Sequence, residues 1–198
     1  MMSSVCQGES GVPSGQDGLL RGVMANILII YSTTDGHTLK ICHRLQEVIG
    51  CQGHEVTLVS VGGCHGSDLL PFDKIVIGAS IRYGRHSPKL VGFINRNVAI
   101  LDSKPNAFFS VNVVARKPEK NRPDTNPYFK KFLMKVAWKP REAAVFAGKI
   151  DYPGYNPFDR FMIRCIMGMT SGPTDPSTVV EYTDWRQVED FGHVIGKM

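Results

Sequence analysis

The sequence lacks the two glycine-rich motifs that hold the phosphates of larger nucleotides. It contains neither the Gly-x-x-x-x-Gly-Lys-Ser/Thr loop of nucleotide triphosphatases nor the Gly-x-Gly-x-x-Gly fingerprint of dinucleotide-binding folds. It also lacks any run of the roughly 18 apolar residues that a membrane-spanning helix requires. These absences argue against an ATPase or GTPase, against a dinucleotide-binding domain of the usual kind, and against a helix that crosses a membrane.

Cysteine is sparse and irregularly placed. The chain contains five of them: Cys6, Cys42, Cys51, Cys64 and Cys165. Their odd number and spacing match neither a disulfide framework nor a paired Cys-x-x-Cys zinc site, and fit a reducing cytoplasm. Cys51, His54, Cys64 and His65 could be drawn as a metal cluster, but ligands so scattered are usually ordinary residues. We therefore expect no metal site.

Acidic residues are scarce in one segment only. Residues 104–141 carry ten Lys or Arg against Glu119 and Asp124, a net charge of +8 in a chain whose total is +5. The rest of the chain is therefore slightly acidic. A basic segment of this kind attracts an anionic partner, whether nucleic acid, an acidic membrane surface or a carboxylate-bearing substrate, or it is simply a solvated loop.

The length and composition suit one domain. The 198 residues, of which 42% are hydrophobic, can bury one substantial core. Residues 1–24 are polar and glycine-rich, and they lack the basic start and apolar stretch of a signal peptide. We expect a disordered extension over 1–24 and one domain over 25–198, with the native start at either Met1 or Met24.

The most informative stretch is an apolar run at 27–31, ILIIY, that leads directly into the hydroxyl residues and glycine of 32–38. This pattern predicts a buried parallel strand that turns into a helix N-terminus. Such a turn can hold a phosphate, because the first helical amides lack partners and the helix dipole is positive there. Since the larger-nucleotide motifs are absent, we expect a mononucleotide, FMN first. Helix capping by the same hydroxyls is the alternative.

The order of the remaining elements predicts the fold. Further strands are expected at 56–61, 74–79, 107–113 and 143–150, with helices between and after them, including one over 88–101. Parallel strands need crossover connections, so this order predicts a flavodoxin-like, doubly wound, five-stranded parallel sheet covered on both faces. In that fold the ligand lies beyond the carboxyl ends of the first and third strands.

A long basic insertion, about 114–142, separates the fourth and fifth strands. Within it, Asn126 and Pro127 predict the start of an amphipathic helix with four apolar residues: Phe129, Phe132, Leu133 and Val136. This helix either packs on its own domain or docks to a membrane or partner. The methionine-rich helix expected at 158–169 either packs on the sheet or exposes an apolar edge to lipid. Asp184 predicts the cap of a closing helix.

Five motifs, taken together, are specific: STTDGHT at 32–38, IGASIRYG at 77–84, SVNVVARKPEK at 110–120, DRFMI at 159–163 and YTDW at 182–185. With these motifs, residues 25–198 resemble the flavodoxin-like, menaquinone-dependent protoporphyrinogen IX dehydrogenases of bacterial haem biosynthesis. The resemblance implies FMN as cofactor, protoporphyrinogen IX as substrate and a membrane quinone, menaquinone or ubiquinone, as electron acceptor. It also implies a peripheral position on the cytoplasmic face of the inner membrane.

The resemblance assigns the cofactor site residue by residue. The FMN phosphate would lie against Ser32, Thr33, Thr34, Asp35, Gly36, His37 and Thr38. One side of the flavin ring would face Ala79, Ser80, Ile81, Arg82, Tyr83 and Gly84. The other side would face Ser110, Val111, Asn112 and Val113.

Arg82 and Tyr83 are the candidate catalytic residues. A guanidinium 4 Å from an anionic reduced flavin would contribute ~4 kcal/mol at an effective dielectric of 20, about 90 mV on a two-electron couple. Exposure of Arg82 to solvent is the alternative. Tyr83 and His86 could relay a proton, although packing or solvent contact is the simpler interpretation of both. By charge and position, the substrate propionates are expected near four cations: Arg116, Lys117, Lys120 and Arg122.

Three other functions compete with this one. An FMN-dependent NAD(P)H:quinone reductase would need a second nucleotide site, of which the sequence gives no sign. A flavodoxin that only carries electrons usually presents an acidic surface, unlike residues 104–141. Nucleic-acid binding is disfavoured because Phe129 and Phe132 fall on the apolar stripe of their helix, apart from its lysines.

Overall fold

The computed structural model describes residues 24–198, so the extension predicted for 1–24 lies, except for Met24, outside the described residues. Its centre is a sheet of five parallel strands in the order β2-β1-β3-β4-β5. The strands are β1 (Asn26–Ser32), β2 (Glu55–Ser60), β3 (Lys74–Ser80), β4 (Asn106–Val111) and β5 (Glu142–Phe146). The predicted doubly wound, flavodoxin-like sheet is therefore confirmed.

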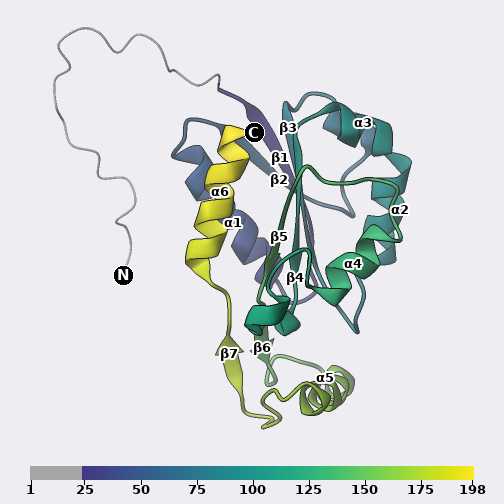
Figure 1. Ribbon diagram of the computed structural model, residues 1–198, viewed down its shortest axis with the longest axis vertical. Helices are drawn as coiled ribbons and strands as arrows, with labels where there is room; N and C mark the ends of the chain where they lie inside the picture. Colours follow the sequence, from purple (N-terminus) through teal and green to yellow (C-terminus); the bar gives the residue numbers. More distant parts are fainter. Residues whose placement is uncertain (1–23) are drawn as a thin grey trace, which may run out of the picture.

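Helices cover both faces of this sheet (Figure 1). One face carries α1 (His37–Gly50) and α6 (Trp185–Lys197), and the other carries α2 (Pro88–Arg96), α3 (Val98–Ser103) and α4 (Pro127–Leu133). Short 3-10 turns lie at η1 (Gly66–Leu69), η2 (Val113–Arg116) and η3 (Pro118–Lys120). Because both faces are covered, the inner strands are largely apolar, and residues 27–30 of β1 are fully buried.

A smaller layer lies beyond the carboxyl ends of the strands (Figure 1). It contains β6 (Lys149–Asp151), which pairs antiparallel with β7 (Val179–Glu181), and α5 (Pro157–Met169). Its small core includes Ile150, Tyr152, Tyr155 and Met167. The helix predicted at 158–169 is confirmed as α5, whereas the β6–β7 pair was not predicted from the sequence.

Two predicted element boundaries were wrong. The strand expected over 143–150 ends at Phe146, because its neighbour β4 ends at Val111 and offers no partner further on. The chain then leaves the sheet, and residues 149–151 pair with β7 instead. The helix expected over 88–101 is interrupted at Asn97, whose side chain caps it by donating to the Phe93 carbonyl at 2.8 Å.

The sequence left two alternatives for each of the helices α4 and α5, and the two helices differ in how much of their apolar surface is buried. In α4, Asn126 caps the first turn as predicted, and Phe129 and Phe132 are buried against Phe108 of the sheet, so the helix packs on its own domain. In α5 only Met167 is buried, and the helix leaves most of its apolar side chains at least partly exposed. No helix within residues 24–198 has the length and hydrophobicity needed to span a bilayer.

Candidate functional site

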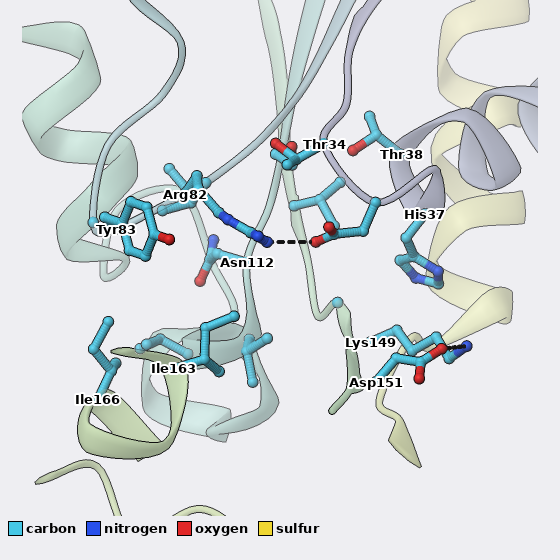
Figure 2. A pocket seen from close by; sticks show the side chains of 18 of the residues that line it. Thr34, His37, Thr38, Arg82, Tyr83, Asn112, Lys149, Asp151, Ile163 and Ile166 are labelled. Atoms are coloured by element: carbon cyan, nitrogen blue, oxygen red, sulfur yellow. Dashed lines mark hydrogen bonds and ion pairs between the residues drawn. The ribbon is translucent and has the colours of Figure 1, made fainter. Parts of the chain in front are cut away.

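A cavity of about 410 Å³ opens at the carboxyl ends of β1, β3 and β4 (Figure 2). Its walls come from the loops that follow these three strands, from residues 148–155, and from the cavity-facing side of α5. This is the position that the fold predicts for a ligand. The volume lies within the usual range for a small-molecule site.

The loop between β1 and α1 leaves hydrogen-bonding groups without partners. Gly36, with φ +78°, turns the chain into α1, and no side chain caps the first amides of this 14-residue helix. The Thr33 and Thr38 hydroxyls are buried, yet neither has a hydrogen-bond partner among the described residues. Buried polar atoms are rarely left unsatisfied, so these groups fit an anionic ligand such as a terminal phosphate.

His37 faces the same cavity as a neutral side chain. Thr183 donates its hydroxyl proton to the Ala147 carbonyl at 2.8 Å, so its oxygen accepts from His37 Nε2, 2.7 Å away. Burial lowers the pKa of His37 below its usual value, and the nearby Lys40 adds to this against the opposing Glu181. The loop therefore presents donors to a phosphate without a fixed positive charge on His37.

The chain reverses direction immediately after β3 in a tight turn. Tyr83 and Gly84 both have positive φ angles, 49° and 75°, while Arg82 and Arg85 exchange backbone hydrogen bonds of 3.0 and 3.2 Å. Positive φ at both central residues is the signature of a type I′ turn. This turn aims the Arg82 side chain across the cavity and leaves the Tyr83 ring at its rim (Figure 2).

Arg82 is held between two carboxylates. One guanidinium nitrogen lies 2.7 Å from Asp35 of the β1–α1 loop, and another contacts Asp159 of α5. The Arg82 side chain is only 21% exposed, so it does not extend into solvent. Burial raises the pKa of Asp35 although Arg82 opposes that shift. The charge of Arg82 is therefore shared, whereas the sequence argument treated it as a lone cation.

Asn112 supplies a further unsatisfied donor at the end of β4. Its Oδ1 accepts from the Ala115 amide at 3.1 Å and from Asn126 Nδ2 at 3.2 Å. Its own Nδ2 is buried without a hydrogen-bond partner in the part of the chain that the structure describes, and it lies on the cavity wall (Figure 2). With its oxygen fixed in this way, the amide group is oriented to donate to an acceptor in the cavity.

Known proteins with similar sequences identify the family of this chain. A family model described as a flavodoxin domain matches residues 28–177. Protoporphyrinogen IX dehydrogenase (quinone) of Escherichia coli strain K12 is 43% identical over 171 residues, covering 86% of this chain and 94% of that protein. The chain belongs to this flavodoxin-domain dehydrogenase family. The resemblance inferred from the motifs is thereby confirmed.

Two further matches agree with the assignment. The dehydrogenase of the same name from Leishmania major is 40% identical to this chain, covering 83% of this chain and 71% of that protein. Among solved structures, oxidised Flavodoxin 2 from Bacillus cereus superposes with a TM-score of 0.53 and 18% identity, covering 87% of this chain and 99% of that one. At that identity, the superposition supports the fold alone.

Most of the predicted cofactor residues of this dehydrogenase line one cavity. They are Thr33, Thr34, Asp35, His37, Thr38, Ser80, Ile81, Arg82, Tyr83, Gly84, Val111, Asn112 and Val113. Ser32, Gly36, Ala79 and Ser110 are not part of its lining. Of these, Ser110 is buried and shares a 3.0 Å hydrogen bond with His86 Nε2, which places His86 in the core under α4.

The four predicted substrate-binding cations lie outside the cavity wall. The Arg116 guanidinium donates to the carbonyls of Val113 and Thr170, so it joins η2 to the end of α5. Lys117 lies between η2 and η3, Lys120 ends η3 and Arg122 follows it, all beyond the wall residues Val113 and Val114. Their role in binding substrate stays a prediction.

Sequence reasoning missed the second half of the cavity wall. Gly148, Lys149, Asp151, Gly154 and Tyr155 contribute from the β6 region, and Ile163, Ile166, Met167 and Thr170 contribute from α5. Lys149 pairs with Asp151 at 2.7 Å (Figure 2). The one available signal was the break at 151–157 followed by a helix too apolar for an ordinary surface position.

Proposed function

We propose that this protein oxidises protoporphyrinogen IX to protoporphyrin IX with FMN as its cofactor and passes the electrons to a membrane quinone. The observation that carries the proposal is a family assignment combined with a cavity whose buried donors suit a flavin mononucleotide. The Thr33 and Thr38 hydroxyls and the first amides of α1 would hold the phosphate, and Asn112 would donate to the flavin ring. The chemistry that FMN would supply when bound is redox chemistry: the flavin can take up hydride equivalents from the methylene bridges of the porphyrinogen.

In the proposed reaction the protein itself would orient the substrate against the flavin and exclude water from the site. We place the porphyrinogen ring against the apolar residues Val113, Ile163 and Ile166, and its propionates toward the cations of η2 and η3, with Arg116, Lys117, Lys120 and Arg122 as candidates. Arg82 would orient reactants and adjust the flavin electrostatically. Tyr83 lines the cavity and donates its hydroxyl proton to Asp159, so it is the candidate for moving a proton near the substrate.

An anaerobic half-reaction tests this function. Protein reconstituted with FMN is mixed with protoporphyrinogen, and flavin absorbance near 450 nm and porphyrin fluorescence are followed before and after a menaquinone analogue is added. We expect the flavin to bleach as porphyrin appears, with turnover only after quinone. If porphyrinogen leaves the flavin oxidised while NADPH reduces it, the protein is an NAD(P)H:quinone reductase instead.

We also propose peripheral association with the cytoplasmic face of the inner membrane, through α5. Phe158, Phe161 and Met169 are 66%, 65% and 78% exposed, and none of the three lines the cavity, although the Phe158 ring meets that of Tyr83 edge to face. The exposed Arg164 and the basic η2–η3 segment, tied to α5 through Arg116, would meet anionic headgroups. Lipid-soluble reactants could then reach the cavity from the bilayer side.

Vesicle sedimentation tests the membrane contact. Wild-type protein should sediment with vesicles that contain phosphatidylglycerol, and the double variant F161S/M169S, which leaves the Phe158 contact with Tyr83 intact, should lose most of that binding. The matched control is Leu70→Ser, because Leu70 is 62% exposed on a different part of the molecule. Equal binding by F161S/M169S and wild type would rule out α5 as the contact, and a change from dimer to monomer in solution would mean that a second copy covers it.

A further inference from the structure

Asp159, in the first turn of α5, contacts both residues that the turn after β3 aims at the cavity. One of its carboxylate oxygens pairs with the Arg82 guanidinium, and the other accepts the Tyr83 hydroxyl proton. The Asp159 side chain is only 15% exposed. Asp35, Arg82, Tyr83 and Asp159 together form what we name the Asp159 bridge.

Two aromatic contacts add to the bridge, one from Tyr155 just before α5 and one from Phe158 in its first turn. The Arg82 guanidinium lies 5.4 Å from the centre of the Tyr155 ring, and the Tyr83 and Phe158 rings meet edge to face at 6.4 Å. No backbone pairing joins these two segments within residues 24–198. The side chains of the bridge and these rings therefore hold the start of α5 to the turn.

The remaining anchors of α5 are few. Only Met167 of the helix is buried, Arg160 donates to the Tyr152 carbonyl at 3.0 Å, and Arg116 donates to the Thr170 carbonyl at 2.8 Å. Ile163 and Ile166, which line the cavity, follow Asp159 by one and two turns on this lightly anchored helix. The position of the apolar wall therefore depends on how firmly the helix start is held.

The bridge also fixes the charge beside the cavity. With both carboxylates ionised, the Asp35, Arg82 and Asp159 side chains sum to −1, so the positive charge of Arg82 is more than balanced. Removing one carboxylate would leave a neutral pair of Asp35 and Arg82. A nearby redox group would sense that change as a gain of positive potential.

We propose that Asp159 is a positioning residue of the dehydrogenase site, which holds Arg82 and Tyr83 at the flavin and fixes α5 as the wall against which the substrate packs. This inference rests on the proposed FMN-dependent function. It adds a residue outside the cavity lining that acts through Arg82, Tyr83 and the helix.

The test uses Asp159→Asn, which retains the shape of the side chain and removes its charge. In the FMN-loaded protein we expect the equilibrium constant for two-electron reduction of the flavin to increase at least tenfold, which raises its potential by about 30 mV. In the protein without FMN we expect faster hydrogen exchange of the α5 amides. In turnover we expect a higher KM for porphyrinogen.

Two control variants separate charge from structure. Asn156→Ala removes the side chain that caps α5 and donates to Asp159 Oδ2 at 3.0 Å, without changing charge, so it should speed exchange in α5 and shift the flavin potential less than Asp159→Asn does. Asp175→Asn removes an exposed carboxylate in the loop that follows α5, so it should change neither.

The proposal is overturned if Asp159→Asn leaves the flavin potential unchanged, or if Asp175→Asn shifts it equally. A protein that binds no FMN would instead contradict the proposed function. In that case the exchange measurement still decides whether Asp159 holds α5, because it needs no cofactor, and unchanged exchange would overturn the proposal.

Discussion

At the scale of single residues, Arg82 decides how the flavin would be tuned. Arg82→Ala would leave Asp35 and Asp159 without their shared cation, so negative charge near the flavin would increase. We expect the two-electron potential to fall by tens of millivolts. An uncompensated unit charge 4 Å from the flavin corresponds to ~4 kcal/mol at an effective dielectric of 20, or about 90 mV, and here that charge is partly balanced. Spectroelectrochemistry checks this, with Arg85→Ala as a control for the exposed arginine of the same turn. An unchanged potential would remove Arg82 from the mechanism.

His86 should make the stability of the fold depend on pH. Burial, helped by Lys135, lowers its pKa to about 4, whereas an unfolded histidine titrates near 6.5. The stability contribution of the neutral ring is therefore complete above about pH 6.5 and is lost as the pH falls toward 4, at up to about 1.4 kcal/mol per unit.

Urea unfolding at pH 7 and pH 5 measures this effect. The loss of unfolding free energy between the two pH values should be smaller in His86→Gln than in wild type, because the variant has no ring to titrate. Equal losses would show that His86 is already protonated or accessible in the folded protein.

At the scale of elements, the start of α4 is joined to the cavity through Asn126. Its Oδ1 accepts from the Tyr128 and Phe129 amides, and its Nδ2 donates to Asn112 Oδ1 and to the Lys120 carbonyl. Asn126→Ala should cost about 2–3 kcal/mol of unfolding free energy, since buried partners lose their bonds together with the cap. Asp184→Ala, at the exposed cap of α6, should cost about 1 kcal/mol.

Urea denaturation of the cofactor-free protein compares the two cap variants. FMN titration should also show weaker binding by Asn126→Ala, because Asn112 loses a group that orients its amide. If the α6 cap proved the costlier of the two, Asn126 would have no role beyond an ordinary helix cap.

At the scale of the whole molecule, the sheet could be predicted from the sequence because its strands are local patterns. Runs such as 27–31 and 75–79 are almost entirely apolar, and only a doubly covered parallel sheet buries them. The phosphate loop followed from the residues after the first strand. These features depend on neighbours in the chain, which a single sequence displays.

The parts that could not be predicted depend on contacts between distant residues. Asp159 lies 77 residues from Arg82, and β6 turns away from the sheet only because β4 ends at Val111. The part of the cavity wall that comes from α5 could not be predicted either, because the sequence of an apolar helix does not show which of its sides packs against the rest of the protein. For the same reason, the pairing of Arg82 with Asp35 and Asp159 could not be inferred from the sequence.

The size of the cavity has a kinetic consequence. About 410 Å³ is room for one small-molecule ligand, and FMN would take up most of it, so a porphyrinogen and a quinone would share the remaining opening over the flavin and occupy it in turn. Initial rates at several fixed quinone concentrations should therefore give parallel double-reciprocal lines, the pattern of a ping-pong mechanism. Intersecting lines would require a ternary complex and a second entrance. Under the ping-pong scheme an abundant quinone would itself inhibit the enzyme, by occupying the oxidised site that the porphyrinogen needs.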